Sequence, residues 1–134
     1  MPRTIAVPGW KRPRGYSSGV AAKGELVFVA GQVGWDAEER LVSTEFLPQL
    51  ARALENVKAV LDAAGALPEH LTRVTLYLTD AREYLAAAAA VGAEWRRVLG
   101  KVFPAMTAIQ VAALLEEGAK VEIEATAVIP ERQA

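Results

Sequence analysis

Near the C-terminus, hydrophobic and polar residues alternate with the period of two that is typical of a β-strand. Over residues 120–128 this period places an apolar set on one face and a polar set on the other. The apolar set is Val121, Ile123, Ala125 and Ala127, and the polar set is Glu122, Glu124 and Thr126. Residues 107–112 form a second β-rich run, and Gly118 lies between the two runs where a turn needs positive φ. The pattern predicts a long hairpin or a pair of neighbouring strands.

The N-terminal part of the chain has shorter β-rich runs broken by proline and glycine. Residues 4–7 are predicted to form a short strand, which an irregular basic arm follows. Residues 19–22 and 25–30 flank Lys23-Gly24, a two-residue turn that predicts a β-hairpin. Residues 26–30 are apolar at every position, which is typical of a strand that is buried on both faces.

The first segment with an amphipathic helical pattern is residues 44–64, where apolar residues recur every three or four positions. The stripe consists of Phe46, Leu50, Leu54, Val57, Leu61 and Ala64. Pro48 falls near the first turn, where its missing N–H does least harm, and Gly65 is a plausible C-terminal stop.

A strand and a second helix follow. Residues 74–79 alternate with the period of a strand. A helix is predicted over residues 80–100, because Asp80 and Glu83 have the spacing of a capping box. Its apolar stripe consists of Tyr84, Ala88, Val91, Trp95 and Val98.

The predicted order of elements is strand, hairpin, helix, strand, helix, strand and strand, within a single domain of residues 1–134. This order is typical of an α+β fold, here a mixed β-sheet of about six strands with two helices on one face. Helices on one face leave the strand at residues 26–30 without a cover on its other face. The chain has no residues left for that cover, so the pattern predicts a closed homo-oligomer in which another copy supplies it.

Composition then narrows the classes of function. Lys+Arg 15 against Asp+Glu 16 gives a net charge of -1, which indicates no nucleic-acid partner. No apolar run is long enough for a membrane span and no signal-peptide core is present, so we expect no membrane partner and a cytoplasmic protein. The chain has no cysteine and one histidine, and we expect neither a metal site nor a cofactor. That histidine, His70, is predicted to be a solvated loop residue rather than a catalytic one.

Four motifs carry a family resemblance. They are Ala30-Gly31-Gln32, Leu54-Glu55-Asn56-Val57, Phe103-Pro104-Ala105 and Glu122-Ile123-Glu124-Ala125. From about Gly15 to Val128 the chain resembles the YjgF/RidA (Rid) family of small trimeric proteins. The resemblance implies a chorismate mutase-like fold, a homotrimer whose sheets form a central β-barrel, and small-molecule clefts between subunits. It also implies the hydrolysis of enamines or imines with release of ammonia, as in the 2-iminobutanoate/2-iminopropanoate deaminases.

The resemblance further implies which residues line the cleft. Glu122 would handle protons or position the water, and Tyr16 would close the pocket over the substrate. The implied substrate-binding residues are Ala30, Gly31, Gln32, Ala105, Met106 and Thr107. From the residues alone, two other interpretations stay open. Glu122 and Glu124 can form a polar sheet face paired with nearby Lys or Arg, and Tyr16 can be a packing aromatic at the start of a strand.

Met106 is the main departure from the family pattern. The deaminases have an arginine after Pro-Ala that grips the substrate carboxylate, and a thioether cannot replace that two-pronged charged contact. Ala30 and Ala108 stand where they usually have a serine and a cysteine or similar small residue, which makes the pocket more apolar. Arg12 or Arg14 is a candidate to compensate from the arm. The resemblance and this departure from it leave two functions open: hydrolysis with an altered substrate or weakened activity, and a non-catalytic trimer that binds or senses a small metabolite.

Overall fold

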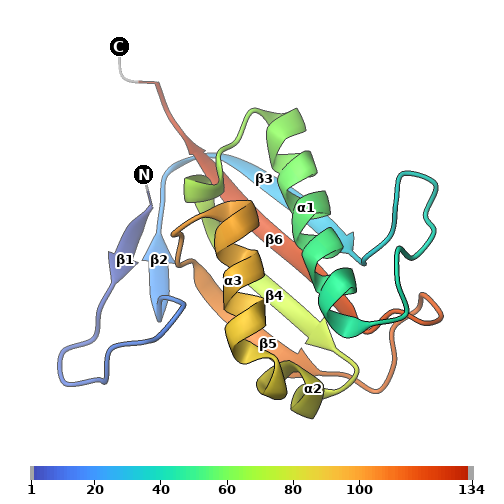
Figure 1. The fold of residues 1–134 in the computed structure, drawn as a ribbon. Coiled ribbons are helices and arrows are strands. Elements are labelled where there is room, and N and C mark those ends of the chain that lie inside the picture. The colour runs from blue at the N-terminus through green and yellow to red at the C-terminus, as the bar shows by residue number, and fades with distance from the viewer. Residues whose placement is uncertain (1, 133–134) are drawn as a thin grey trace.

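A computed structural model describes residues 2–132 of the chain. Figure 1 shows a twisted sheet with the helices packed against one face and a small two-stranded ribbon beside it. The strands are β1 (Arg3–Ile5), β2 (Gly19–Ala21), β3 (Gly24–Gln32), β4 (Leu71–Leu78), β5 (Ala105–Gln110) and β6 (Val121–Pro130). The helices are α1 (Phe46–Ala64), α2 (Ala81–Ala86) and α3 (Ala88–Leu99), and a 3₁₀ turn spans Pro68–His70. The predicted α+β fold is confirmed, with its strands divided between two sheets.

The main sheet has the strand order β3-β6-β4-β5. β4 and β5 are parallel, whereas β6 is antiparallel to both of its neighbours, β3 and β4. In β6 the side chains of Val121, Ile123 and Ala127 are 0% exposed, while Glu122 and Glu124 point to the opposite face. The predicted alternation of the two faces is therefore confirmed.

Two predicted strand pairings are wrong. The hairpin over residues 19–30 does not form, because β2 pairs with β1 and β3 pairs with β6. Gly24 is not a turn residue but the first residue of β3, where a Cβ would lie 1.9 Å from the Ile129 carbonyl oxygen. β5 and β6 are not neighbours either, since β4 lies between them. The chain reaches β5 from β4 through α2 and α3, the crossover that a parallel pair requires.

Helix α1 packs the predicted stripe against the sheet. Its buried members are Phe46, Leu50, Leu54, Val57 and Leu61. Ala64, the last predicted member, is exposed. Gly65 ends the helix with φ 77, a left-handed conformation that glycine adopts without steric cost. Each buried leucine contributes roughly 1.5–3 kcal/mol, so this stripe is a main source of stability.

The second predicted helix is divided in two at Ala87. As predicted, Asp80 caps its start, and Oδ1 accepts hydrogen bonds from the amides of Arg82 (3.0 Å) and Glu83 (3.3 Å). Ala87 interrupts the helix with φ -100 and ψ 13. Beyond the break, α3 buries Val91, Trp95 and Val98. The stripe pattern located these core residues, but a run of alanines carries no signal for the change of direction.

His70 is buried rather than solvated, which corrects the sequence prediction. Only 8% of its surface is exposed, and Nδ1 accepts a hydrogen bond from the amide of Leu67 at 3.0 Å. The imidazole thereby satisfies a backbone donor that the short 3₁₀ turn leaves without an internal partner. His70 therefore holds the turn that leads into β4.

The sheet face opposite the helices, here called the open face, is uncovered in the protomer. On this face β3 exposes Leu26 (56%) and Phe28 (73%), and β5 exposes Ile109 (48%). Val29 points to the helices and is buried. Within one copy of the chain, β3 is therefore buried on one face only. That a second copy covers the other face stays a prediction.

Candidate functional site

A β-bulge near the end of β3 forms one part of the candidate site. The pairing with β6 shifts between Val29 and Gln32, so Ala30 and Gly31 leave the regular register. A Cβ on Gly31 would lie 2.2 Å from Oε2 of Glu122, which places this carboxylate directly against the Gly31 backbone. Nε2 of Gln32 donates a hydrogen bond to the Ala30 carbonyl at 3.1 Å and braces the bulge. Ala30, Gly31, Gln32 and Glu122 are therefore together, and we call them the bulge half-site.

The two carboxylates of β6 differ in their partners. The Tyr77 hydroxyl donates a hydrogen bond to Oε1 of Glu124 at 2.6 Å, and this bond is the main cause that raises the pKa of Tyr77. Within residues 2–132, neither Glu122 nor Glu124 forms an ion pair with lysine or arginine. The protomer therefore does not support a charge-paired polar face. Glu122 is the carboxylate that remains available to a ligand or a water molecule.

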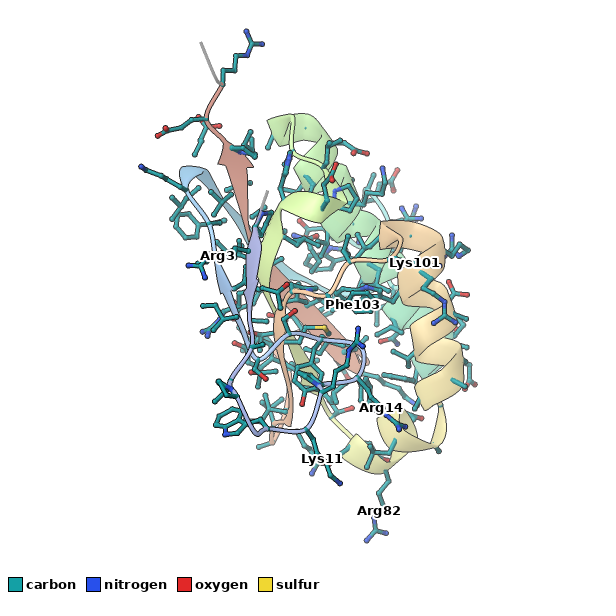
Figure 2. All side chains as sticks on the ribbon, turned by 90° about the vertical axis from the view of Figure 1, so that its left-hand side faces the viewer. Arg3, Lys11, Arg14, Arg82, Lys101 and Phe103 are labelled. Atoms are coloured by element: carbon teal, nitrogen blue, oxygen red, sulfur yellow. The ribbon has the colours of Figure 1, made fainter. Side chains whose placement is uncertain are left out.

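The second part of the candidate site is a cavity of ≈ 740 Å³ between α3, the edge strand β5 and the loop that precedes β2. We call it the aromatic cavity, and its apolar wall includes Tyr16, Tyr84, Trp95, Phe103 and Met106. Figure 2 shows this side of the molecule, with Phe103 near its middle. Ser17 fixes the loop, because its amide donates to the Pro104 carbonyl at 3.0 Å and its hydroxyl to the Phe103 carbonyl. This anchor places Tyr16 at the cavity.

Met106 and Glu122 lie on opposite faces of the sheet. Met106 is opposite Val74 of β4, which is buried under the helices, and it packs against the same core. Glu122 is opposite Tyr77 and shares the open face. Because β4 also separates β5 from β6, one protomer does not bring the aromatic cavity and the bulge half-site together.

The other two predicted residues of β5 do not line the aromatic cavity. Ala105 and Thr107 alternate with Met106 and are opposite Arg73 and Thr75, so they lie on the open face. Thr75 is in turn opposite Glu124 rather than Glu122. Thr107 therefore lies across β4 from Glu124. Both β4 and β6 separate its strand, β5, from the bulge in β3.

Apart from Tyr16, sequence reasoning missed the aromatic side chains that wall the cavity. The stripe pattern predicts Tyr84 and Trp95 as core residues, and both do pack against the core. They lie at the edge of the core, so each also presents a surface to the cavity. Two aromatic residues in one helical stripe were the available signal.

Cationic side chains also line the aromatic cavity. Arg14, one of the two arginines considered as a substitute for the missing one, lines the aromatic cavity, whereas Arg12 does not. Arg96 and Lys101 also line it, and no sequence pattern pointed to them. The cavity thus combines an apolar wall with positive charge.

Among residues 2–132, no group of three His, Cys, Asp or Glu side chains is arranged to hold a metal ion. None of the helices described here combines the length and apolar character needed to cross a bilayer.

Comparisons with known proteins point to one family. A family model described as "Endoribonuclease L-PSP" matches residues 10–129. The chain is 32% identical over 132 residues to the 2-iminobutanoate/2-iminopropanoate deaminase of Salmonella typhimurium, which covers 96% of this chain and 98% of that protein. It is 37% identical over 110 residues to protein DfrA of Myxococcus xanthus, which covers 78% of this chain and 77% of that protein.

A solved structure agrees with these sequence matches. The conserved Rid family protein YyfB from Yersinia pestis, whose function is described as unknown, superimposes with a TM-score of 0.85 at 33% identity. The superposition covers 96% of this chain and 98% of the Yersinia chain. Since the family match, the sequence relatives and the fold agree over nearly all of its length, the chain belongs to the YjgF/RidA (Rid) family.

Proposed function

We propose that this protein hydrolyses enamines or imines by a deaminase-type reaction. Water adds to the carbon of the C=N bond, the C–N bond then breaks, and ammonia and a carbonyl product leave. The observation that carries this proposal is the Glu122 carboxylate, which lies against Gly31 without an ion-pair partner among residues 2–132. The Salmonella relative, whose name states this activity, supports the same reaction class.

Glu122 has the chemistry that this reaction needs. A carboxylate can accept a proton from the attacking water and later return it to the leaving nitrogen. Gly31 has no side chain, so a substrate oxygen can approach the backbone N–H groups of the bulge closely. Tyr16 contributes a ring and a hydroxyl on the side of the aromatic cavity.

A complete site needs two copies of the chain in this proposal. The bulge half-site lies on the open face and the aromatic cavity lies on the helix face, so a neighbouring copy is the source of the missing half. In a closed homotrimer each site would take one half from each of two copies. The exposed Leu26, Phe28 and Ile109 give the open face the apolar surface that such packing requires.

Phe28→Glu is expected to convert the trimer into a monomer. The Phe28 ring is 73% exposed in the protomer, and an unpaired carboxylate at a buried interface costs several kcal/mol at each contact. Sedimentation equilibrium at micromolar concentration measures the mass of both proteins. Leu85→Glu is the matched control, because Leu85 is 68% exposed on α2, away from the open face. A monomeric parent protein, or a Phe28→Glu trimer, would contradict the shared site.

Met106 favours a second candidate function, a non-catalytic trimer that binds or senses a small metabolite. Hydrogen bonds to charged groups contribute roughly 1.5–3 kcal/mol each, so losing a two-pronged carboxylate contact costs about two to four powers of ten in affinity. Without a compensating cation, the cleft would bind a 2-imino acid too weakly for efficient turnover.

One assay separates the two functions. A dehydratase generates 2-aminoacrylate or 2-iminobutanoate in place, and the loss of the imine is followed with and without the protein. Acceleration over buffer supports hydrolysis. If only Met106→Arg accelerates the loss, the catalytic groups are present and the carboxylate contact is what the parent chain lacks. If neither protein does, ligand-dependent thermal shifts across a metabolite panel would support the binding function.

Gly31→Ala is expected to lower kcat by about 10²-fold while leaving the fold intact. The new methyl group would lie 2.2 Å from Oε2 of Glu122, so the carboxylate must move. Oε2 is the end of a flexible side chain, which makes the movement cheap for stability, but a misplacement of about 1 Å is enough for a loss of this size. Steady-state kinetics and thermal unfolding measure the two effects. In the control Gly19→Ala, the added Cβ makes an ordinary 3.4 Å contact with Ile5, and both properties should be preserved.

A further inference from the structure

The lining of the aromatic cavity divides into an apolar wall and a cationic rim. The rim consists of Arg14, Arg96 and Lys101, and neither aspartate nor glutamate is among the lining residues. Figure 2 shows Arg14 and Lys101 on the same side of the molecule as Phe103. An apolar hollow surrounded by one sign of charge attracts ligands of the opposite sign. The cavity is therefore complementary to an anion with an apolar body.

The cations of the rim are not engaged by the protein. None of the three forms an ion pair within residues 2–132. The neighbouring Arg97 shows the contrast, because its Nη2 lies 2.9 Å from Glu55 and 2.7 Å from Glu94. Of two successive arginines on α3, Arg97 binds carboxylates of the protein, and Arg96 remains available at the cavity.

The aromatic wall is held in place before any ligand binds. Nε1 of Trp95 donates a hydrogen bond to the Val102 carbonyl at 3.1 Å. Tyr84 packs edge-on against Phe46, with ring centroids 6.4 Å apart and an interplanar angle of 82°. Burial raises the pKa of Tyr84, so its hydroxyl stays protonated at neutral pH and can donate a hydrogen bond. A preorganised wall of this kind reduces the entropy lost on binding.

We propose that the aromatic cavity selects 2-imino acids with an aryl or similarly large apolar side chain, whose carboxylate is held by the cationic rim. The inference rests on the proposed function and names its substrate class. Met106 is uncharged and cannot hold a carboxylate. Arg14, Arg96 and Lys101 would supply the positive charge from the rim of the cavity instead.

The size and chemistry of the cavity favour a large side chain. A volume of ≈ 740 Å³ lies within the range of about 300–1,000 Å³ that takes drug-sized ligands. A three- or four-carbon imino acid would leave most of this space empty. An aryl ring can stack on Trp95 or Tyr84, and the Met106 thioether makes favourable contacts with aromatic rings.

Turnover of two imines tests this substrate class. An L-amino acid oxidase generates the imine of L-phenylalanine or of L-2-aminobutyrate in place, and imine loss is followed with the full chain. The aryl imine is expected to have a kcat/KM at least tenfold higher than that of the four-carbon imine. Arg14→Gln and Lys101→Gln should each raise KM for the aryl imine several-fold, with kcat within about twofold. Arg82→Gln, an exposed cation of α2 outside the cavity, should change neither.

The outcomes separate this inference from the proposed function. Efficient hydrolysis of the four-carbon imine without a preference for the aryl imine overturns the substrate class and leaves the deaminase proposal standing. If no imine is hydrolysed, the deaminase proposal fails, and calorimetry with stable ligands tests the cavity by itself. The cavity should then bind 3-phenylpropionate at least tenfold more tightly than propionate or 3-phenylpropanamide. Equal affinities for the acid and its amide would overturn the role of the rim.

Discussion

Gln49→Leu is expected to lower the free energy of unfolding by about 3–5 kcal/mol. Gln49 is 0% exposed, and its Nε2 donates hydrogen bonds to the carbonyls of Ser43 (2.9 Å) and Gly118 (3.0 Å). Its Oε1 accepts a hydrogen bond from the amide of Lys120 at 2.7 Å. Leucine fills nearly the same volume but leaves three backbone groups without a partner, at roughly 1–3 kcal/mol each when buried. The midpoint of thermal unfolding should fall by about 10 °C or more.

The measurement is made at a fixed protein concentration, because the unfolding of the homotrimer proposed above would depend on it. Gln110→Leu is the matched control, since Gln110 is exposed and its Oε1 accepts one hydrogen bond, from the Ala81 amide at 2.7 Å. That substitution should cost about 1 kcal/mol or less, because water can replace the lost partner. A cost below 1 kcal/mol for Gln49→Leu would show that the three backbone groups find water instead.

Gln49 also connects the core to the candidate site. Two of its three hydrogen bonds, those with Gly118 and Lys120, join the start of α1 to the segment that leads directly into β6, the strand that carries Glu122. Gly34 allows this arrangement, because a Cβ there would lie 2.5 Å from the Gln49 Cα atom. A buried polar residue in the first turns of α1, beside its apolar stripe, thus helps to set the approach of the chain to the bulge half-site.

The elements of this fold follow from local patterns, but their partners do not. The alternation in β6 is readable because one face packs under helices and the other does not. Nothing within residues 19–30 shows that β3 will pair with β6, a hundred residues later in the chain, rather than with β2. Buried polar residues are equally hidden, since the burial of His70 and Gln49 depends on backbone groups that only the folded chain brings to them.

The structure brings together some of the residues expected at the candidate site. Gly31 and Glu122 are in close contact, because Gly31 has no Cβ to hold the carboxylate away, and their role in a site stays a prediction. Their separation from Met106 depends on the register of β4 with β5 and β6, because a shift by one residue would turn Met106 to the open face. Sequence periodicity cannot give that register, so it could not show that the two halves face opposite ways.

Glu122→Gln is expected to lower kcat for imine hydrolysis by about 10²–10⁴-fold with a much smaller change in KM. The amide has nearly the shape of the carboxylate but cannot accept a proton from the attacking water, and general acid–base groups typically contribute a factor of this size. Stability and subunit assembly should be unchanged, since Glu122 forms no ion pair within residues 2–132. Initial rates of imine loss, together with thermal unfolding and sedimentation, measure the three properties.

Glu124→Gln makes this test specific to one of two carboxylates on the same face of β6. Glu124 accepts a hydrogen bond from the Tyr77 hydroxyl, and the amide oxygen of glutamine can accept the same bond. The Glu124→Gln variant should therefore keep kcat within about twofold of the parent, because in the proposed reaction Glu122, and not Glu124, accepts and returns the proton. If instead Glu124→Gln loses activity and Glu122→Gln keeps it, the proton-handling group is Glu124. The imine would then be hydrolysed over Tyr77 and Thr75 rather than at the bulge beside Gly31.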